Sequence, residues 1–205
     1  MTRWKQTQKN SCGAAALMCA AIELGVGAIP IQPEVDPTWI VNCPMRVPNR
    51  AAEMHIYHVT SGIGGGLVDG YSLPSRIYRV CVGLRLMATA YIPRSFVSIA
   101  MTYLYPKERE HAQAVGMKVF HHEPPAPMGN QRLLKILRVG ERKWWKPNDS
   151  LHYIMVRPEN SRWSIMEPAC GMNFYDYYDM KYNYHRRIDL SCTDTEIGIL
   201  IEPLF

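Results

Sequence analysis

A cysteine stands where a polar segment gives way to a helix-forming run, in QTQKNSCGAAALMCAAIELG at residues 6–25. A thiol attacks a carbonyl carbon only as the thiolate, and a helix N-terminus favours that anion through its partial positive charge and its unpaired N–H groups. Cys12 is therefore a candidate nucleophile for chemistry at an acyl carbon. The competing interpretation is a small core residue in a buried, alanine-rich helix.

A nucleophilic thiolate needs three further groups. A histidine takes the thiol proton and returns it to the leaving group, and an acceptor on the other ring nitrogen fixes the tautomer of that histidine. Hydrogen-bond donors must also stabilise the oxyanion. His152, Glu167 and Gln6 have the required types. Gln6 precedes Cys12 by six positions, so its amide and the Cys12 N–H are candidate oxyanion donors.

The histidine and the carboxylate lie in two segments of strand character, LHYIMV at 151–156 and RWSIMEP at 162–168. The RPENS sequence between them suits a tight turn near Asn160. His152 and Glu167 are nearly equidistant from this turn, so an antiparallel hairpin brings them together. His152 also has a structural alternative, as an ordinary strand residue.

Other polar residues fit some of these roles, and the sequence leaves them open. A surface position for Glu167 would transfer the orienting role to another acceptor, and the conformation of the loop before Cys12 decides which glutamine faces the oxyanion. The alternatives are Asn148, Asp149 and Asn160 for the orienting role and Gln8 for the oxyanion donor.

The elements that must position these groups follow from residue patterning. The run from 12 to 24 predicts a buried helix, with Asn10 or Ser11 as N-cap and Gly25 at its end. Five prolines make 26–48 a loop. Further helices are expected at 49–59, 74–83 and 94–114 (the last kinked by Pro106), and strands at 84–92, 151–156, 162–168 and 196–203. Helices precede a β-rich last third, so we predict an α+β fold, with an N-terminal helical part packed on a C-terminal antiparallel β-sheet.

Three other stretches have structural explanations. The glycine-rich SGIGGGLVDG at 61–70 lacks the spacing of a phosphate-binding loop, which favours a surface turn. Adjacent residues of a strand point to opposite faces, so His121 and His122 predict a surface pair and no metal site. The aromatic FYDYYDMKYNYHRR at 174–187 suits equally a peptide-binding wall and an amphipathic helix with inward tyrosines.

Composition describes one ordinary globular domain. The 205 residues are 47% hydrophobic and 20% charged, enough to build a core without metal or disulfide support. The six cysteines form no CxxC pair and have no zinc-finger spacing, so we expect reduced thiols, most of them buried. The thiol chemistry itself requires no cofactor.

Charge and the N-terminal sequence limit the partners and the compartment. The net charge of +5 is mild and the basic residues are scattered, which argues against a nucleic-acid surface. The opening MTRWKQTQKNSC has no apolar signal-peptide core, and no run of about 18 apolar residues exists to span a membrane. We expect a cytoplasmic protein, or one secreted without a classical signal peptide as a delivered effector.

Two blocks of the chain together resemble one enzyme family. QTQKNSCGAAAL resembles the Gln-x5-Cys-Gly-x-Ala motif of papain-like cysteine peptidases of the C39 type, which cleave double-glycine leader peptides. HYIMVRPENSRWSIMEPACG resembles the segment of that family in which a histidine opens a strand and Asp-Pro-x-x-Gly follows the next strand. The resemblance implies a papain-like fold, with Cys12 as nucleophile, His152 as general base and acid, and Gln6 in the oxyanion hole.

The chain departs from the pattern of that family. Glu167 replaces the usual aspartate, so either its strand recedes or the longer side chain folds back. No membrane or ATPase domain accompanies the peptidase, and the segment 26–150 is longer and richer in proline. We therefore expect a single papain-like domain over 1–205, with an extended helical and loop insert within 26–150, and do not transfer the leader-peptide substrate.

These patterns predict a cysteine protease that cleaves a peptide bond in a protein or peptide substrate, in the role of a bacterial effector or toxin. A deamidase or an acyl transferase would use the same thiol and imidazole, because the chemistry up to the thioester is shared. A third hypothesis is a catalytically inactive papain-like module that binds a partner through 174–187.

Overall fold

The computed structural model describes residues 1–37, 39–40, 42–61, 70–93, 107–141, 150–160, 162–188 and 190–204. Several predictions fall outside these ranges. They concern the glycine-rich turn over 62–69, the part of the third helix over 94–106, and the orienting roles of Asn148 and Asp149.

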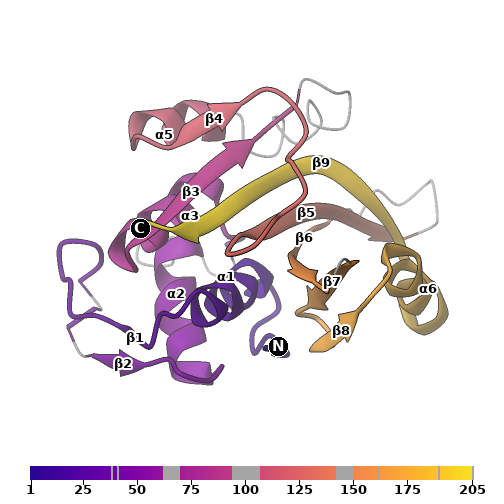
Figure 1. Ribbon diagram of the computed structural model, residues 1–205, viewed down its shortest axis with the longest axis horizontal. Helices are drawn as coiled ribbons and strands as arrows, with labels where there is room; N and C mark the ends of the chain where they lie inside the picture. Colours follow the sequence, from indigo (N-terminus) through magenta and orange to yellow (C-terminus); the bar gives the residue numbers. More distant parts are fainter. Residues whose placement is uncertain are drawn as a thin grey trace.

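A seven-stranded mixed sheet runs through the molecule (Figure 1), with the strand order β4-β3-β9-β5-β6-β7-β8. Strands β3 and β4 are parallel, whereas every other neighbouring pair in this sheet is antiparallel. The strands are β3 (Leu86–Tyr91), β4 (Lys118–Phe120), β5 (Arg132–Glu141), β6 (Ser150–Glu159), β7 (Arg162–Glu167), β8 (Met172–Phe174) and β9 (Leu190–Pro203). Two further short strands, β1 (Ala28–Ile29) and β2 (Cys43–Pro44), form a separate antiparallel pair.

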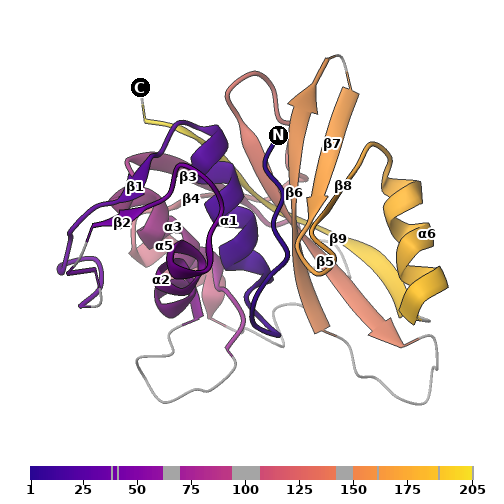
Figure 2. The same cartoon turned by 90° about the horizontal axis from the view of Figure 1, so that it is seen from below.

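Helices cover both faces of this sheet, as Figure 2 shows: α1, α2 and α3 lie on one side and α6 on the other. The larger core forms where the first three helices meet β3, β5, β6 and β9, and a smaller core lies under α6. The described helices are α1 (Cys12–Glu23), α2 (Arg50–Ser61), α3 (Pro74–Gly83), α5 (Glu108–Ala114) and α6 (Tyr177–Ile188).

Helix α1 is the central element of the larger core. Its first ten residues are buried because small side chains let it pack closely against α2 and β6. A Cβ at Gly13 would lie 2.5 Å from the Cβ of Ser72, so no larger residue fits there. Gly25 follows the helix at φ +90°, a conformation that glycine adopts without strain. Ser11 occupies the N-cap position as predicted, but its side chain makes no capping bond.

Most predicted elements are confirmed. The helices α1, α2 and α3 and the strands β3, β6, β7 and β9 lie where the patterning placed them, and α5 lies within the predicted helix over 94–114. The prediction missed β4, β5 and β8, began β9 too late, and gave 26–48 as a loop although it contains β1 and β2. The stretch 174–187 is largely helix α6, as the helix interpretation supposed. Its Tyr177 packs against the smaller core, whereas Tyr178 and Tyr182 are exposed.

The arrangement is α+β, as predicted, although the helical and β-rich parts are not separate in sequence. Strand β3 follows α3 and pairs with β9 near the C-terminus, so the segment 26–150 supplies both helices and strands to the shared core. None of the helices in the described ranges combines the length and the apolar character needed to span a bilayer.

Candidate active site

Helix α1 begins at Cys12, so the thiol lies at the positive end of the helix dipole, against strand β6. The backbone N–H of Tyr153 donates to Cys12 Sγ at 3.4 Å. The cysteine is 2% exposed, at the edge of the larger core. The predicted nucleophile therefore lies next to the strand that carries the predicted histidine.

His152 lies between the thiol and a carboxylate. Its Nε2 is hydrogen-bonded to Glu167 Oε1, and Cys12 is its other electrostatic partner. Burial of the ring opposes its protonation, but the charges and hydrogen bonds of Cys12 and Glu167 outweigh burial and raise the pKa of His152 to about 10. The raised pKa favours the imidazolium, the form that stabilises a neighbouring thiolate.

Glu167 ends strand β7, and its carboxylate folds back onto the turn that follows. Oε1 accepts the N–H of Ala169 at 2.9 Å, and Oε2 accepts the N–H of Cys170 at 2.8 Å. Burial alone would raise the pKa of Glu167, but the bond to His152 and these turn donors lower it to about 2. Of the two conformations expected for a glutamate at this position, the folded-back side chain is therefore the one observed.

The hairpin register accounts for the meeting of these two residues. Met155 pairs with Met166, so His152 and Glu167 lie near the same end of the β6–β7 hairpin, away from the turn. Asn160 is exposed in that turn at φ +41°. Eight residues of strand separate Asn160 from His152, a span of roughly 26 Å at about 3.3 Å per residue, so Asn160 does not orient the ring.

Gln6 lies beside the turn that follows Glu167, but its side-chain amide donates within its own loop. Its backbone N–H donates to Pro168 O at 2.8 Å. Its side-chain Nε2 donates to Gln8 O at 2.8 Å and to Lys9 O at 2.7 Å, and Oε1 is buried without a hydrogen-bond partner among the described residues. Donation from Gln6 to an oxyanion therefore requires one of the two carbonyl bonds to be released. Gln8, the alternative donor, contributes its backbone carbonyl to this loop.

Two comparisons with known proteins find similarity over most of the chain. A family model described as "Invasion plasmid antigen J, cysteine protease" matches residues 4–202. The chain belongs to this family. The cysteine protease IpaJ of Shigella flexneri is 30% identical over 204 residues, which cover 96% of this chain and 76% of the relative. No solved structure matches. Membership of the IpaJ family confirms that the protein is a cysteine peptidase, as predicted. It does not show that the protein belongs to the C39 subtype.

The other thiols of this IpaJ-family chain have different surroundings. None of the six cysteines forms a disulfide, and most of them are buried, as predicted. Burial raises the pKa of the Cys19 thiol to about 12 and that of Cys192 to about 11, and it raises the pKa of Cys43 and Cys81 as well. Cys170 is the most accessible of the six. The neighbouring His152 thus distinguishes Cys12 from the four thiols whose pKa is raised by burial.

Sequence reasoning missed the groups that hold the site in place. The N–H groups of Ala169 and Cys170 bind the Glu167 carboxylate because of the turn geometry, which cannot be predicted from residue types. Glu53, on α2, is 0% exposed and binds the loop before Cys12. A signal for Glu53 existed, because it lies in the same helix turn as the buried Ala52 and Ile56, where a carboxylate needs partners.

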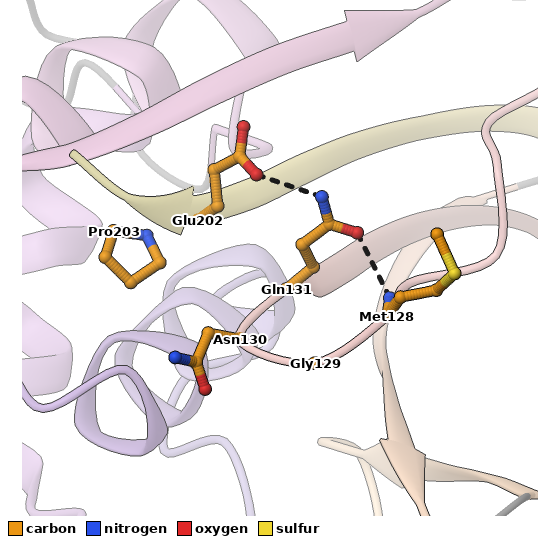
Figure 3. Close-up of a pocket in the computed structure, with 6 residues that line it drawn as sticks. All are labelled: Met128, Gly129, Asn130, Gln131, Glu202 and Pro203. Atoms are coloured by element: carbon orange, nitrogen blue, oxygen red, sulfur yellow. Dashed lines mark hydrogen bonds between the residues drawn. The ribbon is translucent and has the colours of Figure 1, made fainter. Parts of the chain in front are cut away.

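Other candidate sites carry less chemistry. Figure 3 shows a surface hollow between the turn at 128–131 and the end of β9, where Gln131 donates to Glu202 at 2.9 Å. Neither a nucleophile nor a histidine lines it. His121 and His122 are exposed, as predicted. Within the described ranges, histidine, cysteine and acidic side chains form no group of three suited to a metal ion.

Gly171 provides a first test of the packing around the site. It has φ +69°, and an added Cβ would lie 2.8 Å from both the N and the Cβ of Lys5. We expect Gly171→Ala to displace the Lys5–Gln6 segment and the turn that holds Glu167. Acylation of Cys12 by p-nitrophenyl acetate should fall at least about tenfold, since small misplacements of catalytic groups reduce rates strongly. Stopped-flow release of p-nitrophenolate measures this rate.

Gly129→Ala is the matched control for this substitution. Gly129 also has a positive φ, +52°, but no atom lies within 4 Å of its added Cβ. Both substitutions introduce backbone strain, whereas only Gly171→Ala introduces the collision with Lys5. Equal acylation rates in the two variants would contradict the role given to this contact.

Proposed function

We propose that the chain is a papain-like cysteine protease with Cys12 as nucleophile, His152 as general base and acid, and Glu167 as the group that orients the imidazole. The observation that carries this proposal is the position of His152, which is hydrogen-bonded to Glu167 through Nε2 and has Cys12 as its other electrostatic partner. The order of elements is also that of the C39-type peptidases, with the nucleophile on an N-terminal helix and the histidine on the sheet. We also propose that residues 1–205 form one papain-like domain, with an extended helical and loop insert within 26–150.

The reaction follows from the charges of these groups. The Cys12 thiolate attacks the scissile carbonyl carbon, and the carbonyl electrons move onto oxygen. The Cys12 N–H, at the first position of α1 and without an intrahelical acceptor, stabilises that oxygen, and the Gln6 amide joins it after releasing a loop carbonyl. The His152 imidazolium protonates the leaving amine as the C–N bond breaks. The neutral ring then deprotonates water, which hydrolyses the thioester.

Glu167 has a constant role through these steps. Its carboxylate accepts the hydrogen bond of His152 Nε2, which leaves the other ring nitrogen for the sulfur and the leaving group. The turn donors at Ala169 and Cys170 hold the carboxylate in its ionised form. The proton therefore moves between the ring and the reactants and does not pass to Glu167.

The family name also supports a role for this protein outside its own cell. The matched model describes an invasion plasmid antigen, and the relative is a Shigella protein. We include in the proposal that the chain acts as a bacterial effector on a host protein substrate.

Product analysis tests the proposed reaction and separates it from its alternatives. A host-cell lysate is incubated with the wild-type protein or with Cys12→Ala, and peptides are quantified by mass spectrometry after labelling of new N-termini. We expect new N-termini that depend on Cys12. A mass gain of about 1 Da at glutamine side chains would identify a deamidase instead, and an amine adduct would identify an acyl transferase. No difference between the two samples would contradict all three reactions and favour the catalytically inactive binding module.

A further inference from the structure

Glu53 is a fully buried carboxylate with no role in the mechanism above. It lies on α2, is 0% exposed, and accepts three hydrogen bonds. Oε1 accepts the N–H of Thr7 at 2.9 Å and the hydroxyl of Ser11 at 2.6 Å, and Oε2 accepts the indole N–H of Trp4 at 2.7 Å.

These three donors surround the catalytic part of the N-terminal segment. Trp4 and Thr7 lie on either side of Gln6, and Ser11 immediately precedes Cys12. Glu53 thus anchors the chain before and after Gln6, and again at the N-cap of α1. The Ser11 hydroxyl oxygen also accepts the N–H of Gln8 at 3.1 Å, and the carbonyl of Gln8 accepts the Gln6 amide. Both proposed oxyanion donors therefore lie on a segment anchored to one carboxylate.

The anchor requires a group with two acceptor oxygens. All three partners are donors, and an acceptor-only group with two oxygens satisfies them together. A glutamine at this position keeps one acceptor oxygen but presents an NH₂ group to the remaining donor. That donor then has no acceptor, and a buried unpaired donor forces the segment to move or costs free energy.

We propose that Glu53 is a positioning residue that holds residues 4–11 so that the Cys12 N–H is directed at the oxyanion and the Gln6 amide joins it after releasing a loop carbonyl. This inference rests on the proposed function, because it assigns no chemistry of its own to Glu53. It predicts a selective defect: steps that create an oxyanion slow, whereas reactions of the thiolate without an oxyanion do not.

Two small reagents separate these steps. The ester p-nitrophenyl acetate acylates the Cys12 thiolate through a tetrahedral oxyanion, which expels p-nitrophenolate as the C–O bond breaks. Iodoacetamide alkylates the same thiolate at a saturated carbon and expels iodide, so no oxyanion forms. In Glu53→Gln we expect the acylation rate to fall about 10- to 100-fold, less than the full loss of an oxyanion donor. The alkylation rate of Cys12 should stay within about twofold of wild type, since Cys12 and His152 are unaltered.

Glu108→Gln is the matched control. Glu108 is also buried, at 8% exposure, and its carboxylate accepts the N–H of Ser75 at 2.6 Å, away from the N-terminal segment. Both variants lose a buried carboxylate and are expected to have lower melting temperatures, measured by circular dichroism. Only Glu53→Gln should lose acylation relative to alkylation.

The outcomes distinguish this inference from the proposed function. An unchanged ratio of acylation to alkylation in Glu53→Gln overturns the positioning role and leaves the Cys12–His152 mechanism in place. An equal ratio change in Glu108→Gln overturns the role too, because the effect would then follow from destabilisation. A wild-type Cys12 that reacts with neither reagent faster than Cys170 overturns the mechanism and the inference together.

Discussion

Replacement of Cys12 by alanine is expected to abolish proteolysis while the fold is retained. Loss of the nucleophile removes the covalent pathway, and in serine proteases the equivalent change lowers kcat by about 10⁶-fold. We therefore expect a fall in kcat/KM of at least about 10⁴-fold, limited by the background of the assay. The measurement is the initial rate of cleavage of a substrate found by N-terminal labelling.

Cys19→Ala is the control for this variant. Cys19 is a second buried thiol of α1, and it contacts neither His152 nor Glu167 among the interactions described for those two residues. Its replacement makes the same small change in volume within the same helix and should leave kcat/KM within about threefold of wild type. A Cys12→Ala variant that cleaves the substrate as fast as Cys19→Ala would contradict the nucleophile assignment.

Replacement of Glu167 by glutamine is expected to have the second largest effect. The neutral amide can present its NH₂ group to the ring and favour the wrong tautomer, a change that costs about 10⁴-fold in a serine protease triad. We expect kcat to fall about 10³-fold or more. Glu167→Asp retains the charge and restores the residue usual in C39-type peptidases, so it should retain more activity than Glu167→Gln.

The pH dependence of kcat/KM provides an independent test of the role of Glu167. The charge and hydrogen bond of Glu167 contribute to the raised His152 pKa of about 10, so wild-type kcat/KM should decline only as the pH approaches 10. Removal of the carboxylate charge destabilises the imidazolium and moves this alkaline decline of Glu167→Gln to lower pH. Identical alkaline limbs in the two proteins would show that Glu167 does not act on the ring.

The same carboxylate links folding stability to acid pH. The Glu167 pKa is lowered from 4.5 to about 2, so its contribution to stability is complete above pH 4.5 and is lost as the pH falls through 2. The difference in melting temperature between wild type and Glu167→Gln should therefore narrow across this range.

The parts of the site that depend on local sequence were predictable. Cys12 precedes an alanine-rich run that forms a helix in almost any context, and Gly25 ends it. The hairpin prediction required only two strand-like segments and a turn, and its symmetry brought His152 and Glu167 together. Local propensity and short-range geometry therefore sufficed to predict helix α1 and the meeting of His152 with Glu167, whereas the meeting of Cys12 with His152 rested on the family resemblance.

The parts that depend on distant partners were not predictable. In RLLKILRVGE, Leu133, Leu134, Ile136 and Leu137 have the spacing of an apolar helix face. The segment is strand β5 because β6 and β9 pair on either side, and its leucines divide between the two cores. Glu53 was missed for the same reason, because its donors lie more than 40 positions away.

The most direct test of the central claim is the rate at which iodoacetamide alkylates each of the six cysteines at pH 6, measured by mass spectrometry in wild type and in His152→Ala. Ordinary thiols are protonated at this pH and react slowly. We predict that wild-type Cys12 reacts at least about tenfold faster than the more accessible Cys170, and that His152→Ala removes this advantage. A Cys12 rate equal to that of Cys170, or one unaffected by loss of the imidazole, would contradict the account.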